Sequence, residues 1–259
     1  RENLRLLPGV SFPPSMHITS SLKDTVTNSD VIVFAVPSQS LRENVRSLIP
    51  HLDPNSIILS ATKGLEKYTA NRMSQVLEDE LPQNFHSRIT VLSGPNLSKE
   101  IAQGMPASTV IASRDEDTAI RAQHIFMSPT LRVYTNTDMI GVELGGSLKN
   151  IIAIGAGISD GLGYGDNGKA AFITRGIAEI TRLGVAAGAN PLTFAGLTGL
   201  GDLITTCYSQ FSRNRYVGEQ LALGNSLEKI LSSMQNVAEG VDTTVGTLAL
   251  ASKLNVDMP

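Results

Sequence analysis

The first half of the sequence alternates five short apolar runs with polar segments of helical character. The runs are mostly β-branched and do not alternate in polarity, which is typical of strands covered on both faces. The segments between them have helical features, such as the acidic first turn of Glu116–Phe126. This βαβ rhythm predicts a doubly wound parallel sheet. The runs are Val31–Val36, Ile57–Leu59, Ile89–Leu92, Thr109–Ala112 and Leu131–Tyr134.

The second half of the sequence has a different pattern. From Asp138 onward no convincing strand follows, and glycine-rich breaks separate helical stretches. We therefore predict an α/β domain over residues 1–137 and an all-α domain over residues 138–259. A chain of 259 residues is long enough for two such units. The predicted helices are Met139–Ser159, Lys169–Ala187, Arg213–Leu223, Leu227–Met234 and Thr243–Leu254.

Composition excludes several function classes. A net charge of −3 argues against a nucleic-acid-binding surface, which would be basic. No apolar run approaches the roughly 20 residues that span a bilayer, so we expect no membrane insertion. The first residues show no signal-peptide pattern. The single cysteine, Cys207, excludes an internal disulfide framework and suits a reducing cytoplasm.

Three of the predicted strands end in residues that suit a binding site. They run into Pro37-Ser38-Gln39, into Ala61-Thr62-Lys63-Gly64 and into Ser93-Gly94-Pro95-Asn96. In a doubly wound sheet, ligands bind outside the carboxyl ends of the strands. Glycines let the backbone approach a ligand, and Lys63 would bring positive charge to a phosphate or a carbonyl. Ordinary βα turns use the same residue types, so each turn taken alone has that alternative.

One lysine stands in an almost wholly apolar helical stretch, residues 138–159. Lys149 and Glu143 lie about 240° apart around such a helix, so they do not pair across one face. Desolvation would lower the pKa of Lys149 toward neutrality, which suits a general acid or base. The alternative is a lysine whose ammonium reaches the surface.

A second group of polar residues follows later in the chain. Asp202 ends a glycine-rich turn and could orient a lysine or accept from a substrate hydroxyl. Ser212-Arg213-Asn214 combines a guanidinium, which suits phosphate, with hydrogen-bonding side chains at a helix start. Glu239 gives a weaker signal. The simpler interpretation makes Ser212 an N-cap, Asp202 a turn residue and Glu239 a helix-start acid.

The segment Gly163–Lys169 matches the dinucleotide motif G-x-G-x-x-G and nearly matches a P-loop. We reject both interpretations. The dinucleotide motif requires a preceding strand, whereas the preceding segment is helical. A P-loop would need Ser or Thr where Ala170 stands. We expect a flexible interdomain loop here.

Taken together, these segments resemble the bacterial NAD(P)-dependent glycerol-3-phosphate dehydrogenases over essentially the whole chain. The matching stretches are VFAVPSQSLR, SATKGLE, LSGPNLSKEIAQGMP, GGSLKNIIAIGAGISDGLGYGDNGKAAFITRG, TGLGDLITTCYSQFSRNRYVG and VAEGVDT. The long central match and SRNRYVG are specific. The resemblance implies hydride exchange between NAD or NADP and sn-glycerol 3-phosphate, giving dihydroxyacetone phosphate and supplying phospholipid synthesis. It also implies a cytoplasmic homodimer with a small-molecule substrate and no bound metal.

The resemblance assigns roles to individual residues. Lys149 matches the proton acceptor, and Asp202 would hold it in place. Ser98 stands where the family usually has alanine, and Asn96 where Ser or Thr is usual. The substrate-binding matches are Lys63, Gly94, Asn96, Asp202, Ser212, Arg213 and Asn214, and the cofactor-binding matches are Lys63, Ser98, Arg213, Val237 and Glu239.

The front of the sequence departs from the family pattern. Family members begin with a strand, a GxGxxG turn and its helix, which this sequence lacks, so residues 1–137 resemble the remainder of a dinucleotide-binding domain. The residue that would choose between NAD and NADP belongs to that segment. Two alternatives stay open. One is a two-domain dehydrogenase acting on a hydroxy acid or sugar acid, and the other is a non-catalytic remnant.

Overall fold

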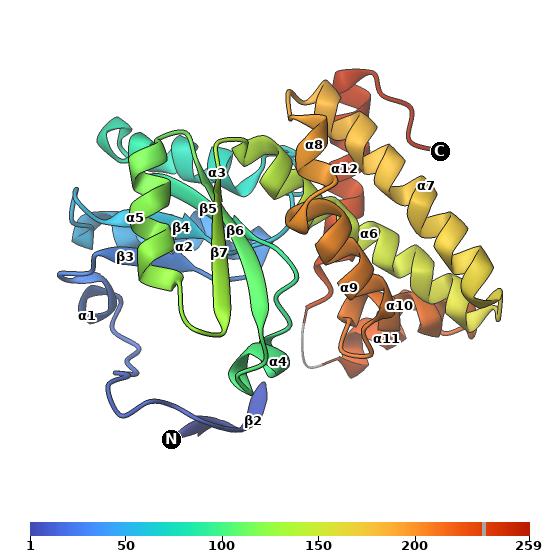
Figure 1. The fold of residues 1–259 in the computed structure, drawn as a ribbon, viewed down its shortest axis with the longest axis horizontal. Helices are drawn as coiled ribbons and strands as arrows, with labels where there is room; N and C mark the ends of the chain where they lie inside the picture. The colour runs from blue at the N-terminus through green and yellow to red at the C-terminus, as the bar shows by residue number, and fades with distance from the viewer. Residues whose placement is uncertain (235–236) are drawn as a thin grey trace.

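The computed structural model describes residues 1–234 and 237–259. Five strands form one sheet in the order β3-β4-β5-β6-β7 (Figure 1). Each strand coincides with one of the five apolar runs, and the predicted α/β fold class followed by helices is confirmed. The strands are β3 (Val31–Phe34), β4 (Ile57–Ser60), β5 (Ile89–Ser93), β6 (Ala107–Ser113) and β7 (Leu131–Asn136).

The sheet differs from the expectation at one pair of strands. β3, β4 and β5 run parallel, and so do β6 and β7, but β5 and β6 are antiparallel. A parallel connection needs a crossover that returns the chain to the starting edge of the sheet, usually by a full-length helix. The connection Gly94–Pro106 holds only the short helix α4 (Ser98–Ala102), so β6 starts at the edge where β5 ends.

Helices cover both faces of the sheet, as the apolar runs predicted. Successive side chains of a strand point to opposite faces. Ile58 accordingly packs in the cluster that includes residues of α1, α2 and α3, while Ile57 and Leu59 pack in the cluster that includes α5. All three side chains are fully buried. These helices are α1 (Leu22–Val26), α2 (Leu41–Leu48), α3 (Met73–Glu80) and α5 (Glu116–Phe126).

Before the sheet, a small antiparallel pair that the sequence did not predict joins β1 (Glu2–Asn3) and β2 (Leu7–Ser11). After β7 the described residues form helices and no further strand. The division into two domains at residue 138 stays a prediction. The helices of the second half are α6 (Met139–Gly161), α7 (Gly165–Ala186), α8 (Pro191–Phe194), α9 (Asp202–Tyr208), α10 (Arg213–Ala222), α11 (Leu227–Ser233) and α12 (Glu239–Leu254).

Helix α6 runs through the helical half and contacts α7, α9, α10 and α12. By length and composition alone it could cross a membrane, so the expectation that no segment approaches that length was wrong. Most of this helix is buried inside the protein, which is also what the core helix of a globular protein shows. Its apolar character follows from packing on most faces.

The segment Gly163–Lys169 is not an interdomain loop: it comprises the end of a short helix–helix turn and the first residues of α7. α6 ends at Gly161, and α7 begins at Gly165. Gly163 and Gly165 both have positive φ, which explains why glycines stand there. The rejected strand–turn–helix motif is absent because α6 precedes the turn.

Candidate active site

Two lysines and one aspartate form a buried charged cluster where the sheet meets the helices. Lys149 Nζ lies 2.9 Å from Asp202 Oδ1, and Lys63 Nζ lies 2.6 Å from Asp202 Oδ2. Lys149 is 7% exposed and Asp202 2%. Lys63 also donates to the carbonyl of Gly94, at 2.8 Å. Residues predicted from three separate stretches of sequence therefore meet around one carboxylate.

The chain places Asp202 through an unusual turn. A π-helical turn, η4 (Leu197–Gly201), leads directly into α9, so that Asp202 is the first residue of α9. π-Helical turns are rare and are frequent at functional sites. One turn later, Thr206 accepts a hydrogen bond from Lys149 Nζ at 2.6 Å and donates one to Asp202 Oδ1 at 3.1 Å. Thr206 thus fixes the geometry of the pair, a role that the sequence reasoning missed.

Burial sets the protonation behaviour of this cluster. Desolvation lowers the pKa of Lys149 to about 8, and the nearby ammonium of Lys63 adds to the lowering, while Asp202 opposes it. Burial would raise the pKa of Asp202, but Lys149 and Lys63 outweigh it and hold that pKa below its usual value. Asp202 therefore stays ionised near neutral pH, whereas Lys149 can exchange its proton there.

The end of β5 forms one wall of the cluster. Gly94 has a φ of +149°, and an added Cβ would lie 3.1 Å from Thr109 Cα, so a side chain there would be strained and tightly packed. Asn96 holds β6: its Nδ2 donates to the Ser108 carbonyl at 3.4 Å, and its Oδ1 accepts from Thr109 Oγ1 at 3.0 Å. The amide of Asn96 is thus engaged with the neighbouring strand.

Glu239 meets the end of β3. Its carboxylate accepts from the backbone N–H of Ser38 at 3.3 Å and from the Ser38 hydroxyl. Burial raises the pKa of Glu239, against the lowering effect of these bonds and of the positive charge of Arg213. Gly64 closes this corner, since an added Cβ would lie 2.7 Å from Ser38 Oγ and 3.2 Å from Glu239 Oε2. Glu239 therefore lies against Gly64, the residue that follows Lys63.

The start of α10 lies against α6 and α12. Ser212 caps α10 by accepting from Arg215 N at 3.2 Å. Asn214 is buried, donates to Asn150 Oδ1 at 2.9 Å and accepts from Gly240 N at 3.0 Å. The side chain of Arg213, beside them, makes no hydrogen bond or ion pair with any residue that the structure describes. It is exposed and free to bind an anion.

Two of the predicted cofactor residues lie apart from these contacts. Ser98 is exposed at the first position of α4, and Val237 is 47% exposed before α12. Sequence reasoning missed two residues of the site, Thr206 and Asn150, whereas Ser38 belongs to a strand end that it had singled out. Thr206 lies one helical turn after Asp202, and Asn150 directly follows Lys149, so helical spacing and adjacency were the available signals.

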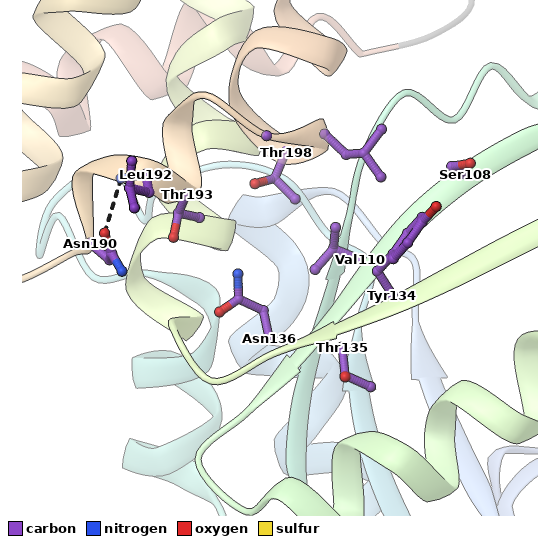
Figure 2. A pocket seen from close by; sticks show the side chains of 11 residues that line it. Ser108, Val110, Tyr134, Thr135, Asn136, Asn190, Leu192, Thr193 and Thr198 are labelled. Carbon is purple, nitrogen blue, oxygen red and sulfur yellow. Dashed lines mark hydrogen bonds between the residues drawn. The ribbon is translucent and has the colours of Figure 1, made fainter.

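A cavity of about 480 Å³ lies between the last two strands and the segment from α8 to η4 (Figure 2). Its lining includes Ser108 on β6, Asn136 on β7 and Thr198 on η4, and the phenol of Tyr134 is the titratable side chain among the lining residues that the structure describes. The Lys149–Asp202 pair is not among its lining residues. An acid–base group works best with a pKa near the working pH, which Lys149 has, so the charged cluster and not this cavity is the candidate active site.

Comparison with known proteins identifies the family. A sequence model described as the N-terminus of NAD-dependent glycerol-3-phosphate dehydrogenase matches residues 1–119, and one for its C-terminus matches residues 138–259. The chain belongs to the NAD-dependent glycerol-3-phosphate dehydrogenase family. The glycerol-3-phosphate dehydrogenase [NAD(P)+] of Dehalococcoides mccartyi is 54% identical, over 96% of this chain and 69% of the relative. The Chlorobium phaeobacteroides enzyme of the same name is 49% identical, over 100% of this chain and 77% of the relative.

Solved structures of the family have the same fold. The glycerol-3-phosphate dehydrogenase of Coxiella burnetii superimposes with a TM-score of 0.94 at 37% identity, covering 99% of this chain and 78% of that one. The Dunaliella salina protein superimposes with a TM-score of 0.89 at 27% identity, covering 98% of this chain and 45% of that one. A ketopantoate reductase from Ralstonia eutropha, at 16% identity and a TM-score of 0.52, shares the fold alone.

Proposed function

We propose that this chain is a glycerol-3-phosphate dehydrogenase that interconverts sn-glycerol 3-phosphate and dihydroxyacetone phosphate with NAD or NADP. The observation that carries the proposal is the buried Lys149 ammonium, held by Asp202 and Thr206 next to Lys63. A lysine with a pKa of about 8 can accept a proton from an alcohol and return it near neutral pH. The names of the relatives give the substrate.

Lys149 is the proton-transfer residue in this proposal. In oxidation, its neutral amine takes the proton from the C2 hydroxyl as the C2–H bond breaks and the carbonyl forms. In reduction, its ammonium gives a proton to the C2 oxygen. A bound nicotinamide nucleotide supplies the hydride acceptor or donor. The balance is one hydride to the nicotinamide and one proton to Lys149, and from there to solvent.

Asp202 and Lys63 prepare Lys149 for this step. The Asp202 carboxylate orients the Lys149 ammonium, and the Thr206 hydroxyl bonds both of them. Lys63 places a second positive charge beside the site, where it would stabilise negative charge that develops on the C2 oxygen. Because both ammonium groups lie close to Asp202, its carboxylate stays ionised and its negative charge is balanced.

The start of α10 is the proposed phosphate site. Among the described residues the guanidinium of Arg213 has no hydrogen-bond or ion-pair partner, and it can bind phosphate with two parallel hydrogen bonds. Ser212 and Asn214 flank it, and Asn214 is itself held by Asn150 of α6. Because Asn150 directly follows Lys149, a phosphate bound here would be tied to the proton-transfer residue, which positions C2 for reaction. Gly94 and Asn96 would border the substrate on the sheet side.

The edge where β3 and β4 end fits the nicotinamide end of the cofactor. Ser38 and Glu239 pack closely on Gly64, where an added Cβ would lie 2.7 Å from Ser38 Oγ, and the neighbouring Lys63 adds a positive charge. Glu239 and Lys63 would hold the cofactor there, with Arg213 beside Glu239. Ser98 and Val237 are proposed as outer contacts.

The proposal is tested by assay of the purified natural protein. Reduction of dihydroxyacetone phosphate is followed with NADH and with NADPH in parallel, and ketopantoate serves as the control substrate. We expect turnover of dihydroxyacetone phosphate with at least one of the two cofactors. Turnover of ketopantoate in its place would contradict the proposal and favour a hydroxy-acid dehydrogenase.

We further propose that the enzyme works in the cytoplasm as a homodimer and supplies glycerol 3-phosphate for phospholipid synthesis. The single cysteine suits a reducing compartment. Its thiol is buried, and burial raises the pKa of Cys207 to about 12, so it is not a reactive thiolate. Light scattering of the purified protein measures the oligomeric state directly, and a monomer at micromolar concentration would contradict the dimer.

A further inference from the structure

Helices α6 and α10 contact each other backbone to backbone at two glycines. An added Cβ at Gly157 would lie 1.9 Å from the Arg215 carbonyl oxygen, and one at Gly218 would lie 1.8 Å from the Ile154 carbonyl oxygen. Side chains therefore cannot interdigitate at these points, although interdigitation is what usually fixes the relative position of packed helices. Other contacts must set where α10 begins relative to α6.

Polar bonds to α6 hold the first turn of α10 from two sides. Asn150, which precedes Gly157 on α6, accepts from Asn214 Nδ2 at 2.9 Å. Asp160, which follows Gly157, accepts from Arg215 Nε at 2.6 Å. The backbone of Arg215 lies between them, against Gly157. The Asp160–Arg215 ion pair therefore restrains the turn that begins at Ser212.

Asp160 is itself fixed by a second cation. Lys169 Nζ lies 2.8 Å from the same Asp160 oxygen and 4.4 Å from the centre of the Tyr208 ring. Lys169 is 5% exposed, so this ion pair is buried. Burial would raise the pKa of Asp160, but the effects of Lys169 and Arg215 outweigh burial, so the pKa of Asp160 lies below its usual value. One ionised carboxylate thus joins α6, α7 and α10.

We propose that Asp160 is a positioning residue for substrate phosphate binding. It acts through Arg215, which fixes the first turn of α10 and with it the guanidinium of Arg213 two residues earlier. Lys169 holds Asp160 in place, which gives a role to the Gly163–Lys169 segment that the active site does not use. This inference rests on the proposed function, because it assumes that Arg213 binds the phosphate of the substrate.

The test compares two substrates in the intact natural enzyme. In Asp160→Asn, kcat/KM for dihydroxyacetone phosphate should fall by about ten- to a hundredfold, since an ångström of misplacement at a site can have that effect. For unphosphorylated dihydroxyacetone it should fall by less than about threefold. Arg215→Lys should also lower the ratio of kcat/KM for dihydroxyacetone phosphate to kcat/KM for dihydroxyacetone, because an ammonium cannot reproduce the guanidinium geometry. If Asp160→Asn does not fold, Arg215→Lys decides.

A double variant and a matched control separate positioning from a general loss of structure. Combining Asp160→Asn with Arg213→Ala should lower the ratio little more than Arg213→Ala alone, because both act on one contact. Glu219→Gln is the control: Glu219 lies 4.0 Å from Arg215, its side chain is 38% exposed, and the ratio should not change.

Equal losses on both substrates, or independent effects in the double variant, would overturn the inference and leave the proposed function standing. A wild-type enzyme that does not reduce dihydroxyacetone phosphate would overturn the proposed function itself.

Discussion

Lys149 combines burial with two fixed partners, and the combination explains how a lysine can act near neutral pH. Without Asp202, desolvation alone would lower the pKa of Lys149 further, and without burial the ammonium would stay protonated well above neutral pH. Thr206 keeps the ammonium and the carboxylate in a defined geometry. The site therefore depends on opposing effects on one ionisable group.

The pH dependence of the two reaction directions should be opposite. Reduction requires protonated Lys149, so its rate should fall as the pH rises through about 8. Oxidation requires the neutral amine, so its rate should rise across the same range. The measurement is kcat against pH in each direction at saturating substrate. The same sign of pH dependence in both directions would show that Lys149 is not the group that exchanges the proton.

Arg213 should determine recognition of the substrate phosphate. Its guanidinium is exposed and unpaired within the described residues, so its loss should not unfold the chain. Arg213→Ala should lower kcat/KM for dihydroxyacetone phosphate by more than about tenfold, and Arg213→Lys by less, because lysine keeps the charge without the planar fork. The ratio of kcat/KM for phosphorylated to unphosphorylated substrate measures this. A ratio that does not fall in Arg213→Ala would place phosphate recognition elsewhere.

At the scale of elements, a buried ion pair joins the start of α3 to α6. Arg72 pairs with Glu143, and the Glu143 carboxylate also accepts from Ser74 N at 2.7 Å and from Ser74 Oγ at 2.6 Å. Both charged side chains are about nine-tenths buried. The pair therefore attaches the sheet half to the helix that carries Lys149.

Removing one partner of this pair should destabilise the fold strongly. Arg72→Met leaves the buried Glu143 carboxylate without its cation, which should lower the free energy of unfolding by about 3–5 kcal/mol. The control is Arg114→Met: the Arg114–Glu78 pair at 2.8 Å is largely exposed on the arginine side, and its loss should change stability by about 0–1 kcal/mol. Urea unfolding of both variants measures the difference. Equal changes would mean that burial does not set the strength of the Arg72–Glu143 pair.

The helices and strands were predictable where local pattern decides. The five runs of β-branched residues became β3 to β7, and the apolar stretch after Asp138 became α6. The direction of β6 was not predictable, because it depends on the path of Gly94–Pro106 and not on the residues of the strand. The segment at Gly163 is a tight turn where the sequence predicts a flexible loop, because its glycines fit both kinds of connection.

At the scale of the whole molecule, the candidate site forms only when distant stretches meet. The sequence points separately to Lys63, Lys149 and Asp202, and the fold brings both lysines to hydrogen-bonding distance of Asp202. The partners that complete the site were not predictable, since Thr206 and Asn150 are ordinary residues whose importance comes from what they contact. Spacing reveals charged residues in apolar surroundings more readily than the neutral groups that hold them.

The most direct test of the central claim is the turnover of Lys149→Ala. We expect kcat for reduction of dihydroxyacetone phosphate to fall by about 10²–10⁴-fold, with the fold intact by circular dichroism. Lys149→Arg should also be poor, because arginine does not give up its proton at working pH. Lys253→Ala, which changes an exposed lysine in the last turn of α12, should behave as wild type. A folded Lys149→Ala variant with the kcat of the wild type would contradict the account.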